Sequence, residues 1–87
     1  MISRATPAFW RAFDRLSNTD QLASRRAHQQ FVGDPTHNSL HFKKLGGYEN
    51  LWSVRVTISI RAVGVRDGDT IIWVWIGTHG EFDSRFG

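Results

Sequence analysis

Cysteine is absent from this chain of 87 residues. Its absence excludes disulfide bonds, thiolate catalysis and thiolate zinc sites, and it fits a reducing cytoplasm. No stretch approaches the roughly 20 apolar residues that a membrane-spanning helix requires. The first ten residues, MISRATPAFW, also lack the apolar core of a signal peptide. We therefore expect a soluble, cytoplasmic protein that has no membrane partner.

The length and charge of the chain narrow its class. We expect one small domain over residues 1–87, able to bury about 60% of the surface that its unfolded chain exposes. No internal repeat or low-complexity segment interrupts it. Eleven Lys and Arg stand against eight Asp and Glu, which gives a formal net charge of +3. This balance favours partners that carry phosphate.

The N-terminal part predicts two helices that form a hairpin. Thr6 provides a capping hydroxyl and Pro7 has the backbone angle of a first helical turn, so the first helix is predicted over residues 7–17. Ser17 begins a second capping segment. Apolar residues then repeat at helical spacing until Gly33, which is followed by an Asp-Pro pair that ends the run.

From residue 40 onward the pattern changes to strands, predicted over residues 40–45, 51–56, 60–66 and 70–76. Short joins make the last three strands an antiparallel meander. The Asp-Gly pair at 67–68 is a hairpin signal, and we expect it to place Val65 opposite Thr70 and Arg61 opposite Val74. The fold class is therefore α+β, with two N-terminal helices packed on one face of a mainly antiparallel, four-stranded sheet.

Titratable residues follow directly after the last predicted strand. Its six consecutive apolar residues, four β-branched and two tryptophan, suit a central strand that is covered on both faces. Two glycines flank Thr78 and His79 and let the backbone leave the sheet. His79 is a candidate general acid or base, which Glu81 could orient. The alternative is a histidine that caps the strand end through a backbone carbonyl.

Two arginines flank the short segment between the second and third predicted strands. A tight loop there would place Arg55 directly opposite Arg61, with both side chains on one face of the sheet. Two adjacent guanidiniums repel each other, so the pair predicts an anion, a phosphate or a carboxylate, between them. Arg61 interrupts an apolar strand, where an unpaired charge is costly to bury. Solvated edge arginines are the alternative, above all for Arg55.

Other polar residues carry weaker predictions. Lys43 and Lys44 point to opposite faces of their strand, so at most one of them can join the two arginines. His37 and His41 have a His-x3-His spacing, but no third ligand is evident, and we predict no metal and no cofactor. The four tryptophans could stack on bases, but three of them lie in apolar strand or helix patterns, and we take core packing as their role.

Several segments resemble, in order, the RelE/ParE superfamily of bacterial toxins from type II toxin–antitoxin systems. They are DPTHNSLHFKKL, LWSVRV and IRAVGVRDGDTIIWVWIGTHGEFD. The arginine-bearing strand, the Asp-Gly turn and the tryptophan-rich strand that ends at His79 recur in that superfamily as a unit. The resemblance covers nearly the whole chain and implies two helices packed on a curved antiparallel sheet.

The resemblance also implies a function and roles for the candidate residues. RelE-like members cut messenger RNA on the ribosome, by attack of a ribose 2′-hydroxyl on its own phosphodiester and without a metal. In that reading Arg61 matches the strand arginine that contacts the scissile phosphate, and Arg55 matches a basic position on the preceding strand. His79 falls where the family places a basic or imidazole group, and Glu81 is a possible base or orienting residue.

Two alternatives to ribosome-dependent cleavage remain open. ParE-like members inhibit DNA gyrase by binding it, and a third possibility is an attenuated copy that does not cut. Many relatives have tyrosine where this chain has Phe82, whose phenyl ring can stack on a base but cannot transfer a proton. The single tyrosine, Tyr48, is no obvious substitute. Each reading implies a cognate antitoxin, whose acidic residues we expect to meet Arg55 and Arg61.

Overall fold

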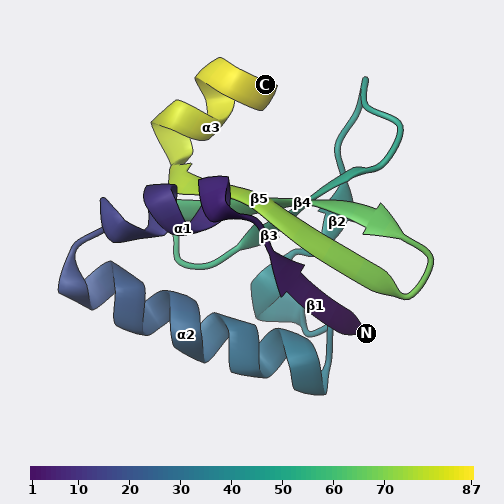
Figure 1. Ribbon diagram of the computed structural model, residues 1–87, viewed down its shortest axis with the longest axis horizontal. Coiled ribbons are helices and arrows are strands. Elements are labelled where there is room, and N and C mark those ends of the chain that lie inside the picture. The colour runs from purple at the N-terminus through teal and green to yellow at the C-terminus, as the bar shows by residue number, and fades with distance from the viewer.

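The computed structural model describes residues 1–87 and is an α+β fold with one mixed sheet (Figure 1). Its elements, in chain order, are β1 (Ile2–Ala5), α1 (Pro7–Asp14), α2 (Asn18–Gly33), the 3-10 turn η1 (Asn38–Leu40), β2 (Lys43–Lys44), β3 (Leu51–Arg55), β4 (Ile60–Asp67), β5 (Thr70–Thr78) and α3 (His79–Phe86).

The sheet has five strands in the order β1-β5-β4-β3-β2, so the prediction of four strands was one short. β1 pairs in parallel with β5, from Ile2 opposite Thr70 to Ala5 opposite Trp73. The other neighbours are antiparallel, as predicted. β1 was not predicted, because only one of its four residues has a large apolar side chain and that side chain is exposed. Its strand form depends on pairing with β5, which no local pattern indicates.

Both predicted N-terminal helices are present and begin at the predicted caps. The Thr6 hydroxyl accepts a hydrogen bond from the Phe9 N–H at 3.2 Å, and the Ser17 hydroxyl accepts one from the Asp20 N–H at 3.1 Å. α1 ends at Asp14, three residues before its predicted end.

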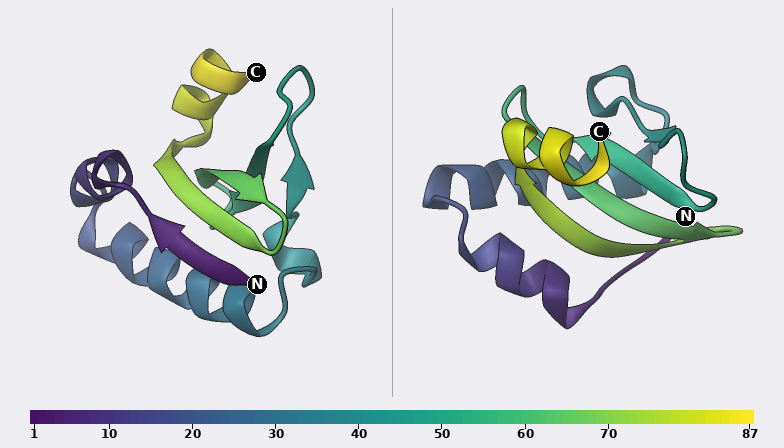
Figure 2. Two further views of the ribbon diagram at one scale, coloured as in Figure 1. Left: turned by 45° about the vertical axis from the view of Figure 1, so that its right-hand side comes forward. Right: turned by 90° about the horizontal axis from the view of Figure 1, so that it is seen from above.

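Figure 2 shows both helices on one side of the curved sheet and α3 on the other. None of the helices combines the length and the apolar character needed to cross a membrane.

The two faces of the sheet carry separate apolar cores. The face beneath α1 and α2 holds the larger core, which includes Phe31 and Trp73. The opposite face, called here the α3 face, holds a smaller core built on Val63 and Trp75. Trp73 and Trp75 lie two residues apart and would share a face in a regular strand. A register shift between Val63 and Gly64 sends them to opposite faces.

The predicted register between β4 and β5 was wrong. Asp67 pairs with Thr70 across a two-residue turn, so Val65 faces Ile72 instead of Thr70. Gly68 has a positive φ of 57°, which glycine adopts without a steric penalty. Together with the bulge, this register places Arg61 opposite Gly77 instead of Val74. Arg61 therefore lies beside the end of β5 and the start of α3.

Three further expectations need correction. The strand predicted over residues 40–45 is reduced to β2, because Leu40 lies in η1 and His41 has a left-handed backbone with φ of 45°. The C-terminal segment is the helix α3, which was not predicted. Trp73 and Trp75 are core residues as expected, but Trp10 is 45% exposed and is not.

We predict that Phe31→Ala destabilises the protein by about 3–5 kcal/mol, because it removes a fully buried ring that contacts Trp73 and Phe42 edge to face. Urea unfolding followed by circular dichroism measures the change. Val32→Ala, at the next helical position and half exposed, is the matched control and should change the free energy of unfolding by less than about 0.5 kcal/mol. Equal losses in the two variants would contradict the assigned core.

Candidate active site

Two arginines lie side by side on the α3 face. Arg55 of β3 pairs with Arg61 of β4, as predicted, and Arg61 pairs in turn with Gly77 of β5. Partial burial and then the charge of Arg55 lower the pKa of Arg61 below its ordinary value, and Asp83 acts in the opposite direction. A guanidinium keeps its positive charge in proteins, so two cations stand side by side here. The two charges form a site suited to an anion.

The guanidinium of Arg61 is held by the loop that joins β3 and β4. Its Nη1 donates hydrogen bonds to the carbonyl oxygens of Thr57 at 2.8 Å and of Ile60 at 3.3 Å. The Thr57 hydroxyl in turn accepts hydrogen bonds from the backbone N–H groups of Ser59 and Ile60. These bonds occupy one terminal nitrogen and leave the other N–H groups of the fork free for a ligand.

His79 is the first residue of α3 and is held at both its backbone and its ring. Its N–H donates to the Ser59 carbonyl at 2.7 Å, which joins α3 to the same loop that holds Arg61. Its Nε2 lies 3.2 Å from the Asp83 carboxylate, one helical turn away. The side chains of His79 and Asp83 are 50% and 62% exposed, so the pair is open to solvent. The imidazole is therefore accessible to a substrate on the α3 face.

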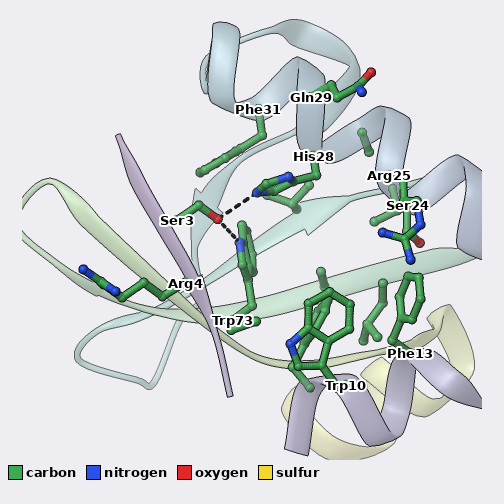
Figure 3. Close-up of a pocket in the computed structure, with 17 residues that line it drawn as sticks. Ser3, Arg4, Trp10, Phe13, Ser24, Arg25, His28, Gln29, Phe31 and Trp73 are labelled. Atoms are coloured by element: carbon green, nitrogen blue, oxygen red, sulfur yellow. Dashed lines mark hydrogen bonds between the residues drawn. The ribbon is translucent and has the colours of Figure 1, made fainter. Parts of the chain in front are cut away.

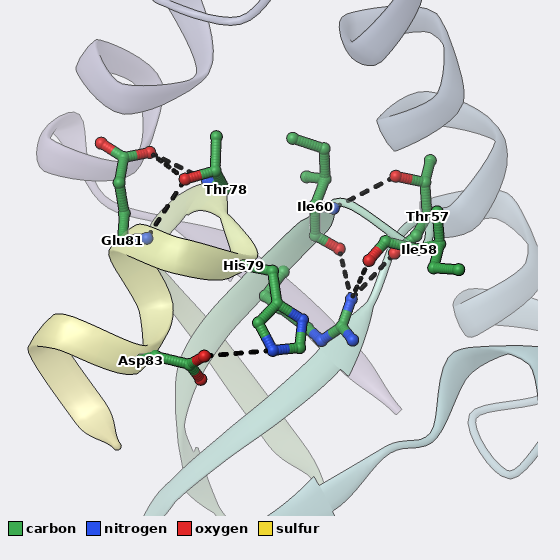
Figure 4. A network of polar contacts seen from close by, with 8 residues as sticks. Thr57, Ile58, Ile60, Thr78, His79, Glu81 and Asp83 are labelled. Carbon is green, nitrogen blue, oxygen red and sulfur yellow. Dashed lines mark hydrogen bonds and ion pairs between the residues drawn. The ribbon is translucent and has the colours of Figure 1, made fainter.

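Glu81 does not contact His79, contrary to the predicted orienting role. Thr78 and Glu81 form a capping box: the Glu81 carboxylate accepts from the Thr78 N–H at 2.9 Å and from its hydroxyl at 3.0 Å. Figure 4 shows this pair on one side of the start of α3, with His79 and Asp83 on the other. Glu81 lines a groove between α1 and α3 that also contains Arg15 and Arg85. Its position is explained by helix capping.

The remaining predicted residues divide between the two faces. Lys43 pairs with Ser53 and therefore shares the face of Arg55, whereas Lys44 pairs with Trp52 and points to the other face. Phe82, on α3, is half-buried. The centroid of its ring lies 6.4 Å from that of the Trp75 ring and 6.5 Å from that of the His79 ring. It anchors α3 to the sheet and lies next to the imidazole.

The structure adds Asp83 to the site, a residue that the sequence reading missed. The available signal was the spacing of four residues between His79 and Asp83, which brings side chains together only on a helix. Because the C-terminal segment was not predicted to be helical, that spacing had no structural meaning. No group of three or more His, Asp and Glu side chains is arranged to hold a metal ion.

A separate cavity of about 370 Å³ lies between the helical hairpin and the sheet, with mostly apolar walls (Figure 3). One wall has a polar chain in which the Trp73 indole N–H donates to the Ser3 hydroxyl at 2.8 Å. The same hydroxyl lies 2.9 Å from Nε2 of His28. None of the residues predicted to form the site lines this cavity.

The fold matches solved toxin structures over nearly its full length. A chain of the RelB–RelE antitoxin–toxin complex from Methanococcus jannaschii superposes with a TM-score of 0.77 at 16% identity, covering 97% of this chain and 99% of that one. The archaeal RelE–RelB complex from Pyrococcus horikoshii gives 0.69 at 13% identity, covering 91% and 94%. The isolated RelE toxin of E. coli gives 0.66 at 12% identity, covering 97% and 96%.

The chain therefore has the fold of RelE-type toxins, as its sequence resemblance implied. No family model and no curated protein sequence matches the chain. The likeness is one of three-dimensional structure, over a sequence in which fewer than one residue in five is shared.

We predict that the capping box of α3 gives the stability of the protein a measurable acid dependence. The Thr78 N–H and hydroxyl, in that order, lower the pKa of Glu81 below its ordinary value. The ionised Glu81 carboxylate therefore stabilises the fold fully above the pKa that Glu81 has in the unfolded chain. This contribution is lost as the pH falls through the lower pKa that Glu81 has in the folded protein. Wild type should exceed Glu81→Gln in free energy of unfolding at pH 7, and the difference should vanish in acid.

Urea unfolding of both proteins over a series of pH values measures this difference. Glu49→Gln, at an exposed loop glutamate, is the control for the loss of one negative charge. A difference between wild type and Glu81→Gln that stays constant from neutral to acid pH would contradict the prediction.

Proposed function

We propose that this chain is the toxin of a type II toxin–antitoxin pair and that it cleaves messenger RNA on the ribosome. The observation that carries the proposal is the Arg55–Arg61 pair beside the His79–Asp83 pair, on the open face of a RelE-type fold. Cations for phosphate and a group for proton transfer thus lie on one surface, which is what phosphodiester cleavage without a metal requires.

The proposed reaction is an internal transesterification of RNA. The ribose 2′-oxygen attacks the adjacent phosphorus, the bond from phosphorus to the 5′-oxygen breaks, and the products are a 2′,3′-cyclic phosphate and a 5′-hydroxyl. The neutral imidazole of His79 accepts the proton of the 2′-hydroxyl as that bond forms. The departing 5′-oxygen takes a proton from solvent, and the imidazolium then returns its proton to solvent, so no redox partner is needed.

The arginines stabilise the negative charge that grows on the phosphate. Arg61 is the better placed of the two, because its guanidinium is already fixed by loop carbonyls and needs little reorganisation on binding. Arg55 adds a second cation from the neighbouring strand, and Lys43 extends the same charged face toward the edge of the sheet. Lys44 lies on the other face and is left out of the substrate site.

Phe82 takes a packing and stacking role in this scheme. Its ring contacts Trp75 and lies next to His79, and a phenyl group offers an RNA base a flat apolar surface. Because it cannot transfer a proton, the acid–base work falls to His79 alone. A chain of this kind needs a cognate antitoxin, and we expect acidic antitoxin residues to cover Arg55 and Arg61 until the toxin is released.

We predict that Arg61→Ala and His79→Ala each lower cleavage of a translated message by about a hundredfold or more, because each removes a group that acts mainly in the transition state. Primer extension maps the 5′ ends of a message before and shortly after the chain is induced without antitoxin. New ends inside codons should appear with wild type and fade in both variants.

Arg26→Ala is the control. It removes one positive charge, as Arg61→Ala does, but from an exposed position on α2, and this variant should cleave the message like wild type. Circular dichroism and copurification with the antitoxin check that every variant is folded. Wild-type cuts that persist in both active-site variants would refute the residue assignment. Arrested growth with intact messages would refute cleavage and direct the next assay to gyrase supercoiling, and harmless expression without antitoxin would indicate an attenuated copy.

A further inference from the structure

The His79–Asp83 pair is built in a way that helix stability alone does not explain. A histidine at the first position of a helix and an aspartate four residues later reverse the order that favours an ion pair on a helix, in which the acid precedes the base. A charged imidazole also lies unfavourably at the positive end of the helix dipole. An exposed pair of this kind contributes at most a few tenths of a kcal/mol to folding.

Asp83 also lies where a carboxylate opposes the binding of an anion. Burial and then the charge of Arg55 lower the pKa of Arg61, and the charge of Asp83 acts against them, so the carboxylate lies near the Arg61 guanidinium. A negative charge at this place weakens the attraction of the face for a phosphate. Its presence therefore calls for a role that outweighs the lost affinity.

The geometry of the imidazole provides that role. Nε2 lies 3.2 Å from the Asp83 carboxylate, and a carboxylate beside this nitrogen favours the neutral tautomer that carries its proton on Nε2. In that tautomer Nδ1 is the unprotonated nitrogen, the one that can accept a proton. Figure 4 shows the His79 ring beside the Asp83 carboxylate, with Thr78 and Glu81 on the other side of the start of α3.

We propose that Asp83 is a positioning residue for His79: it holds the ring by Nε2–H, presents Nδ1 to the 2′-hydroxyl and stabilises the imidazolium that forms when Nδ1 takes the proton. This inference rests on the proposed ribonuclease function. Asp83 touches neither the substrate nor the reacting atoms, and it acts through His79. Glu81, to which the sequence reading assigned this task, is held in the capping box.

A double-mutant cycle on cleavage tests the inference, because residues that act as one unit have effects that do not add. Single-turnover cleavage of a ribosome-bound message is compared for wild type, Asp83→Ala, His79→Ala and the double variant. Asp83→Ala should lower the rate about tenfold in the wild-type background and less than about twofold when His79 is already absent. Asp83→Asn keeps an acceptor oxygen and should recover part of the loss.

Ser84→Ala, at the next exposed position of α3, is the control and should leave the rate unchanged. Equal losses from Asp83→Ala in both backgrounds would overturn the inference, since Asp83 would then act without His79. An unchanged rate together with tighter RNA binding would also overturn it, because the carboxylate would then only reduce the positive charge of the face.

A second measurement does not depend on cleavage. Carbon-13 relaxation of labelled histidine rings reports the motion of each imidazole, and His41, an exposed ring that makes no hydrogen bond, is the internal reference. We expect the His79 ring to be restrained in wild type and in Asp83→Asn, and to become as mobile as that of His41 in Asp83→Ala. Absence of cleavage by wild type would overturn the proposed function, whereas a mobile His79 ring in wild type would overturn the role of Asp83.

Discussion

The extra residue in β5 is the constraint on which the rest of the structure depends. Val74 is the extra residue of the bulge opposite Val63 and Gly64. The bulge places Trp73 on the face beneath α1 and α2 and Trp75 on the α3 face. With regular alternation both indoles would lie on one face of the sheet, and the other face would have neither. One irregularity therefore gives this small sheet a core on each face.

The same irregularity sets the position of the candidate active site. It moves the β4–β5 register so that Arg61 faces Gly77, the residue just before the cap of α3. A side chain at that position would collide with the Trp75 ring, since an added Cβ would lie 2.5 Å from it. The sheet thus provides a cation, and the helix that starts two residues later provides His79, so their spacing follows from backbone pairing and not from flexible loops.

The sequence predicted those parts of the molecule that depend on local patterns. The caps at Thr6 and Ser17 and the opposition of Arg55 and Arg61 all follow from nearest neighbours along the chain or across a tight loop. The parts that depend on distant partners were missed. β1 has no strand signal of its own, and the bulge is a feature of the pairing between β4 and β5, which a period-2 pattern does not indicate.

The arrangement of the candidate site was predicted only in part, for the same reason. Arg61 and His79 were chosen as candidates for their chemistry, because an arginine in an apolar strand and a histidine at a strand end are unusual wherever the chain goes next. The partner of His79 depends on the backbone beyond it: along an extended chain Glu81 would be its neighbour on the same side, and on a helix Asp83 is. The capping box of Thr78 and Glu81 makes that segment helical, so the glutamate that looked like the partner is the residue that brings the true partner into place.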